Sequence, residues 1–145
     1  MDLNRSVDTL NSLLRGEISA VETYDQALEK LEGDVEVAPQ LSACRSSHEE
    51  RVSLLRDEIV RLGGDPADGS GPWGAFAKLV EGGAKAFGRA AAIAALEEGE
   101  DHGLKEYRDG LPKLDAAVRS SLEGELLPRQ QQTHRAMSTL KKIIH

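Results

Sequence analysis

Apolar residues recur at alternating intervals of three and four through most of the chain, which is the spacing of the inward face of a helix in a bundle. A first helix is predicted from about residue 3 to 32. Its inward positions are Leu3, Val7, Leu10, Leu14, Glu17, Val21, Tyr24, Leu28 and Leu31. A second helix is predicted to begin near Pro39, a residue suited to a first helical turn, and to end at the Gly63 and Gly64 pair. Its inward positions are Leu41, Arg45, His48, Val52, Leu55, Ile59 and Leu62.

The second half of the chain repeats this pattern after a stretch rich in turn residues, GGDPADGSGPWG. We expect residues from about 64 to 84 to form a long crossover. A third helix is predicted from about 85 until Gly110 and Pro112 stop it, with inward positions Ile93, Glu97, Glu100, Leu104, Tyr107 and Leu111. A fourth helix is predicted to follow, with inward positions Val118, Leu122, Leu126, His134, Met137 and Ile144. Pro128 lies inside it and predicts a bend that leaves the inward register around Gln130, Gln131 and His134 open by one position.

The composition fits this pattern. The 145 residues suffice for one domain spanning 1–145, and 39% apolar, 3% aromatic and 30% charged residues favour amphipathic helices. Because a crossover makes the helices on either side of it parallel, the predicted fold is all-α, a four-helix bundle with one long crossover between helices 2 and 3.

Charge and hydropathy exclude several partners. A formal net charge of −7 argues against a nucleic-acid binder, which needs a basic face. No stretch reaches the roughly 18 consecutive apolar residues of a membrane helix. The start, MDLNRSVDTL, does not resemble a signal peptide, and the single Cys44 cannot form an internal disulfide. We therefore expect a cytoplasmic protein.

Two of the predicted helices share a motif 83 residues apart. Gly16-Glu17 is followed by Tyr24, seven residues after the glutamate, and Gly99-Glu100 is followed by Tyr107 at the same distance. The chain thus reads as two related helical hairpins.

Polar residues interrupt the apolar seams at one level of the predicted bundle. They are Glu17 on the first helix, Arg45 and His48 on the second, Glu97 and Glu100 on the third, and His134 on the fourth. Burying a carboxylate costs several kcal/mol unless it is paired, hydrogen-bonded or bound to a metal. Three clustered carboxylates therefore need a neutralising partner.

These features together resemble the ferritin-like superfamily, especially rubrerythrin- and bacterioferritin-type bundles and a small bacterial ferritin-like family of uncharacterised function. The features are the helix lengths, the crossover, the Glu17 to Tyr24 spacing and the motif Glu97-x-x-Glu100. The resemblance covers nearly the whole chain. It implies an iron or manganese centre with Glu17 and Glu100 as principal carboxylates, Glu97 as an additional one, and His48 and His134 as nitrogen ligands.

The chain departs from that family pattern at two positions. Di-iron members use Glu-x-x-His, whereas this chain has Arg45-x-x-His48 and Gln131-x-x-His134. An arginine at a ligand position opposes a cation electrostatically. The alternative is a metal-free layer in which Arg45 neutralises the carboxylates. In that layer Arg45 pairs with one or two of Glu17, Glu97 and Glu100, and the tyrosines donate to the remainder. Tyr24 and Tyr107 are most simply core residues, while in the family interpretation they donate to carboxylates of the opposite helices.

Two hypotheses of different classes follow. The first is a small ferritin-like protein that binds one or two iron or manganese ions and acts in oxidative stress. The second is a non-enzymatic helical bundle that serves as an oligomerisation or interaction module. A homodimer is compatible with both.

Overall fold

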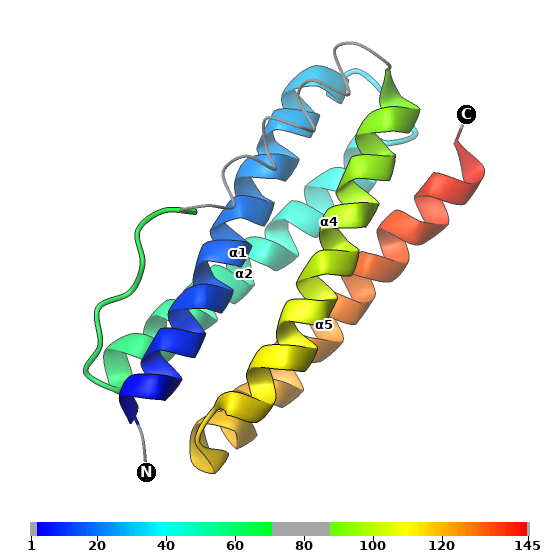
Figure 1. The fold of residues 1–145 in the computed structure, drawn as a ribbon. Coiled ribbons are helices and arrows are strands. Elements are labelled where there is room, and N and C mark those ends of the chain that lie inside the picture. Colours follow the sequence, from blue (N-terminus) through cyan, green and yellow to red (C-terminus); the bar gives the residue numbers. More distant parts are fainter. Residues whose placement is uncertain (1–2, 71–87, 145) are drawn as a thin grey trace.

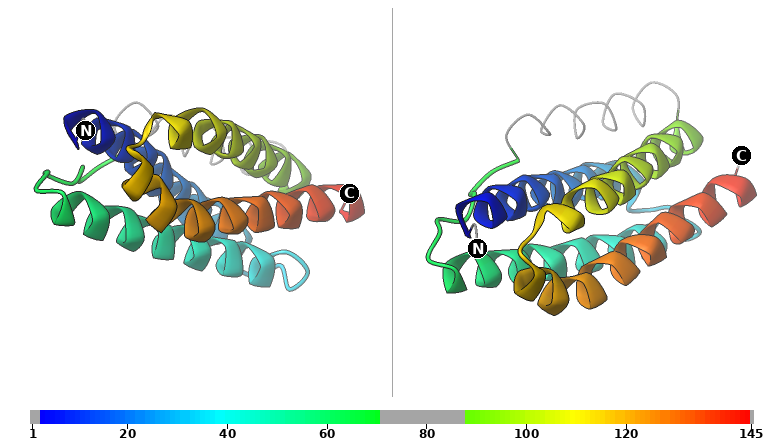
Figure 2. Two further views of the ribbon diagram at one scale, coloured as in Figure 1. Left: turned by 90° about the horizontal axis from the view of Figure 1, so that it is seen from below. Right: turned by 60° about the horizontal axis from the view of Figure 1, so that its bottom comes forward.

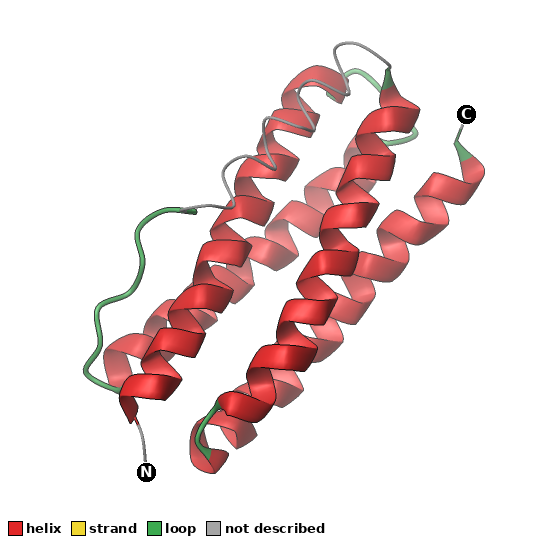
Figure 3. Cartoon of the chain, in the orientation of Figure 1, coloured by secondary structure: helices red, strands yellow, loops and turns green. Residues whose placement is uncertain are grey.

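The computed structural model describes residues 3–70 and 88–144, and its secondary structure is helical. The four long helices are α1 (Leu3–Leu31), α2 (Ala38–Arg61), α4 (Arg89–Gly110) and α5 (Ala116–Ile143). A short 3-10 helix, η2 (Leu111–Lys113), connects the last two (Figure 3). The prediction of an all-α chain with four principal helices is confirmed, and the bounds of α1 and α2 agree with it to within about two residues.

Local sequence signals set the helix ends. Gly63 adopts a φ of +81°, and the amides of Gly63 and Gly64 bond back to Val60 and Ile59 at 2.9 Å, which is a Schellman end of α2. Asp115 caps α5 by accepting from the Ala117 amide at 3.3 Å. Helix α4 begins at Arg89 rather than near residue 85, because Gly88 has a φ of +82° and is not helical.

The helices form two antiparallel hairpins, α1 with α2 and α4 with α5 (Figure 1). Helix α1 also packs against α4, and α2 against α5. Helices α2 and α4 run in the same direction and lie diagonally across the bundle (Figures 1 and 2). Most of the predicted crossover lies outside the described residues. Its described beginning is tied to α1, because the Asn11 side chain bonds to the backbone of Asp65 and Ala67 at 3.0 and 2.7 Å.

Two apolar clusters make up the core. One contains Leu10, Leu13, Leu14, Val52, Leu55, Ile59, Tyr107, Leu111, Leu114, Val118, Leu122 and Leu126. The other contains Tyr24, Ala27, Val37, Leu41, Cys44, Ile93, Leu96, Met137, Leu140 and Ile144. Polar side chains separate the two clusters, so the bundle has a polar layer in the middle of its length. Within the described ranges, no helix is sufficiently long and apolar to cross a membrane.

Candidate functional site

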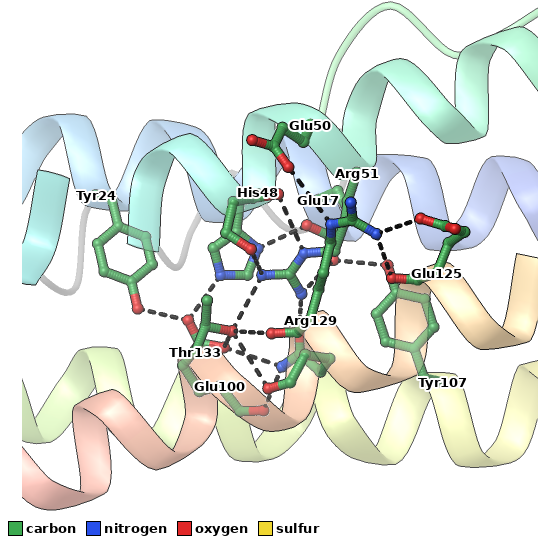
Figure 4. Close-up of polar contacts among 12 residues, drawn as sticks. Glu17, Tyr24, His48, Glu50, Arg51, Glu100, Tyr107, Glu125, Arg129 and Thr133 are labelled. Atoms are coloured by element: carbon green, nitrogen blue, oxygen red, sulfur yellow. Dashed lines mark hydrogen bonds and ion pairs between the residues drawn. The ribbon is translucent and has the colours of Figure 1, made fainter. Parts of the chain in front are cut away.

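All four helices contribute side chains to the buried polar layer (Figure 4). Six side chains with a charged, amide or hydroxyl group form it: Glu17 of α1, His48 and Arg51 of α2, Glu100 of α4, and Gln130 and Thr133 of α5. None of these six residues is more than 4% exposed. Tyr24 and Tyr107, also buried, contact the layer from its two sides.

His48 bridges the two carboxylates of the layer. Its Nδ1 lies 2.6 Å from Glu17 Oε2, and its Nε2 lies 2.7 Å from Glu100 Oε2. An ionised carboxylate only accepts hydrogen bonds, so both ring nitrogens carry a proton and the ring is an imidazolium. Burial lowers the pKa of His48, but Glu100 and Glu17 outweigh burial and raise that pKa to about 9.

The two carboxylates are ionised despite their burial. Burial raises the pKa of Glu100, yet His48, Tyr24 and Arg51 outweigh it and lower the pKa to about 2. Burial likewise opposes ionisation of Glu17, and Arg51 together with His48 brings its pKa below the usual value. Opposite charges and donated hydrogen bonds are therefore stronger here than the loss of hydration.

Arg51 is the second cation of the layer, and its guanidinium is completely enclosed by protein. Nη1 donates to Gln130 Oε1 and lies 3.3 Å from Glu17 Oε1. Nη2 donates to Thr133 Oγ1 at 3.0 Å and to Ser47 Oγ at 3.3 Å. The planar group thereby connects three helices, as the fixed fork of an arginine allows.

Helix α5 supplies neutral groups that complete the bonding of Glu100. Gln130 Nε2 donates to the Glu100 carbonyl at 2.8 Å and to its Oε1 at 3.0 Å. Thr133 Oγ1 donates to the same Oε1 at 2.7 Å while accepting from Arg51. Both cations of the layer thus come from α2, and α5 contributes none.

The two tyrosines form reciprocal bonds between α1 and α4. Tyr24 of α1 donates to Glu100 Oε2 at 2.5 Å, and Tyr107 of α4 donates to Glu17 Oε1 at 2.8 Å. Burial and the adjacent carboxylate raise the pKa of each phenol well above its ordinary value, so both remain donors. Each tyrosine is therefore a core residue and a donor to the carboxylate of the opposite helix.

A small cavity of about 70 Å³ lies against the layer between α1 and α4. Gly16 and Ala20 of α1 and Gly99 and Gly103 of α4 line it, so the two small-residue pairs follow the same 83-residue repeat as the glutamates. Across residues 3–70 and 88–144, every buried side-chain nitrogen and oxygen has a hydrogen-bond partner.

The structure brings together three of the five predicted ligand residues, Glu17, His48 and Glu100. It does not bring in the other two. The Glu97 side chain is 19% exposed, and its Oε1 lies 3.9 Å from Lys141 Nζ. The His134 side chain is 26% exposed, and its Nε2 lies 2.8 Å from Asp101 Oδ1. The inward placement of Glu97 was wrong by one residue, and the register left open at His134 is settled one residue earlier, because α4 and α5 turn the neighbouring residues Leu96 and Thr133 inward instead.

The predicted neutralising arginine was also the wrong one. Arg45 is 32% exposed and pairs with Asp25 and Glu49 at the surface of the bundle. Arg51 takes the buried role, one helical turn after His48 on the same face. Residues 44, 48 and 51 have the same three-and-four spacing as residues 45, 48 and 52, so the sequence was also compatible with an inward Arg51.

The side chains as arranged do not fit the metal centre that the ferritin-like resemblance implies. A histidine ligand binds metal through an unprotonated nitrogen, and both nitrogens of His48 are protonated and bonded to carboxylates. Arg51 brings a fixed positive charge to Glu17. Within the described part of the chain, no group of three or more His, Cys, Asp or Glu residues is arranged to hold a metal ion.

Comparison with known proteins places most of the chain in one family. Residues 5–113 match a family described as a domain of unknown function (DUF2383). The matched range contains Glu17, His48, Arg51 and Glu100 and ends before α5. Neither the curated proteins nor the solved structures gave a match.

Proposed function

The chain belongs to the DUF2383 family, and we propose that it is a non-enzymatic four-helix module whose buried polar layer works without metal. One observation carries this proposal. The guanidinium of Arg51 and the imidazolium of His48 face the carboxylates of Glu17 and Glu100, and the buried polar atoms of the described residues all have protein partners. Such a closed set of bonds specifies how the helices meet and occupies the polar groups of this layer.

The same proposal includes a ferritin-like architecture. The parallel, diagonal placement of α2 and α4 supports it, as does the convergence of Glu17, His48 and Glu100 at mid-bundle (Figures 1 and 4). In this view Arg51 and the protonated His48 provide the positive charge that a metal provides in metal-binding ferritin-like bundles.

We further propose that the module associates with a second copy of itself through the face between α2 and α5. A hollow of about 320 Å³ on this face is lined by residues including Gln40, Gln132, Ala136, Thr139 and Ile143. Ile143 is 60% exposed. Each copy has a net charge of −7, so two copies repel each other over most of their surfaces. The lining of this hollow contains no acidic residue, so the repulsion is weakest there.

The alternative function is that of a metal-binding protein with a role in oxidative stress. The convergence of Glu17, His48 and Glu100 favours it, because two carboxylates and an imidazole form a common ligand set for iron and manganese. The buried Arg51 opposes it.

Metal analysis separates the two functions. The purified protein is incubated anaerobically with ferrous iron, or with Mn²⁺, and desalted. We expect no stoichiometric metal and an unchanged melting temperature. Retention of about one or two ions per chain, lost in the Glu17→Gln variant, would establish the metal-binding alternative.

Light scattering tests the self-association. We expect a dimer for the natural chain and a monomer for Ile143→Lys, which adds a charge to the proposed contact. Val60→Lys is the matched control, because Val60 is 62% exposed on α2 but lies outside the lining of the hollow. A monomeric natural chain at micromolar concentration, or equal effects of the two substitutions, would contradict the proposed face.

A further inference from the structure

We infer that Arg51 and the proton of His48 together substitute for one divalent cation, and that replacing Arg51 by a neutral residue converts the layer into a divalent-cation site. The site would be formed by Glu17, His48, Glu100 and Gln130. This inference rests on the proposed function, in which the natural layer binds no metal.

The charge count of the layer is the first support. Two buried carboxylates, Glu17 and Glu100, are balanced by the guanidinium and by the imidazolium. A divalent ion bound beside a neutral imidazole would give the same balance. Loss of the Arg51 charge leaves an uncompensated negative charge in a dry interior, where such a charge is costly and attracts a cation.

The atoms around the guanidinium are the second support. Arg51 Nη1 contacts Glu17 Oε1 and Gln130 Oε1, and Nη2 contacts Thr133 Oγ1. Carboxylate and amide oxygens of this kind are ligands that Mn²⁺ prefers, and an imidazole nitrogen can join them. Two members of the proposed site, Glu17 and Gln130, thus already bond the guanidinium through oxygen atoms that a cation could use.

The position of His48 gives the third support. The ring lies between Glu17 and Glu100 within 2.7 Å of both, so it stands at the centre of the potential ligand set. To bind a cation it must release one proton. In the natural chain a cation would also have to displace the enclosed arginine.

Substitutions at residue 51 test the inference, with Mn²⁺ as the probe. Arg51→Gln removes the charge and retains an amide, while Arg51→Lys retains the charge. After equilibrium dialysis we expect about one Mn²⁺ per chain for Arg51→Gln and a higher melting temperature with Mn²⁺ than without. We expect no retained Mn²⁺ for Arg51→Lys, for the surface control Arg45→Gln or for the natural chain.

The outcomes are distinguishable. A folded Arg51→Gln variant that takes up no Mn²⁺, or an Arg51→Lys variant that binds equally well, would overturn the inference and leave the proposed function intact. Mn²⁺ bound by the natural chain would refute the proposed function itself. If Arg51→Gln unfolds, recovery of its helical circular dichroism on addition of Mn²⁺ supports the inference, and failure to recover counts against it.

Discussion

The Tyr24 hydroxyl lies 2.5 Å from Glu100 Oε2, although the two residues are 76 positions apart and belong to different hairpins. Tyr107 and Glu17 repeat this relationship in the opposite sense. Each pair joins α1 to α4 through a hydrogen bond to a buried charge. The layer consequently fixes how the two hairpins are placed against each other along the bundle axis.

Tyr24→Phe and Tyr107→Phe should each lower the free energy of unfolding by about 1.5–3 kcal/mol, the usual contribution of a hydrogen bond to a charged group. The ring remains, so packing is preserved and the loss reports the hydroxyl. Guanidinium denaturation of the two variants measures it. A cost below about 0.5 kcal/mol for both, within the range of ordinary surface substitutions, would mean that the carboxylates do not depend on these donors.

Arg51→Met should destabilise the protein by about 3–5 kcal/mol, because it removes one of the two cations that balance the buried carboxylates Glu17 and Glu100. Arg45→Met, six residues earlier on the same helix, should cost at most about 1 kcal/mol, since its ion pairs with Asp25 and Glu49 are exposed. Urea denaturation of both variants compares them directly. Equal costs would contradict the assignment of Arg51 as the internal cation.

The stability of the protein should decline at both ends of the pH scale. The pKa of His48 rises from 6.5 to about 9 on folding, so its stabilisation is complete below pH 6.5 and is lost as the pH rises towards 9. The pKa of Glu100 falls from 4.5 to about 2, so its stabilisation is present above pH 4.5 and is lost as the pH falls towards 2. Denaturation between pH 3 and 9.5 should show this profile. A His48→Gln variant should lack the alkaline decline between pH 6.5 and 9, and an identical decline in that variant would assign it to other groups.

Gly103→Ala should destabilise the protein by about 1–3 kcal/mol. A Cβ at this position would lie 2.7 Å from Gln130 Nε2, and that amide is held in place by Glu100 and Arg51. Displacing it would leave buried polar groups unpaired. Gly124→Ala is the matched control in α5. Its Cβ would meet no atom within 4 Å, so the better helix propensity of alanine should add about 0.5–1 kcal/mol. Thermal melts of both variants should therefore shift in opposite directions.

The apolar periodicity was enough to predict the four helices, and it placed Glu17, His48 and Glu100 inside the bundle. The glutamates and tyrosines were detectable because they repeat at an interval of 83 residues in a region of continuous helix. The reciprocal contacts of the tyrosines followed from the family resemblance and not from the spacing. Side-chain pattern is therefore a good guide to which elements form and to their most regular inward positions.

The apolar pattern did not determine which of two adjacent residues points inward at one turn of each of α2, α4 and α5. Spacings of three and four alternate in more than one way, so the inward face of α2 includes residues 44 and 51 beside the predicted 48 and 52, but not residue 45. In α5, Pro128 interrupts the regular helix bonding, and the inward position is Thr133 instead of His134. Packing against the neighbouring helices decides among such registers, and a single sequence does not report it.

Both positive charges of the polar layer reside in the first hairpin, together with only one of the two carboxylates, Glu17. The second hairpin contributes Glu100 and neutral groups. Within the assembled layer, the first hairpin therefore contributes an excess of one positive charge and the second an excess of one negative charge. Electrostatic attraction between the two hairpins across this layer therefore favours one placement of the first hairpin against the second.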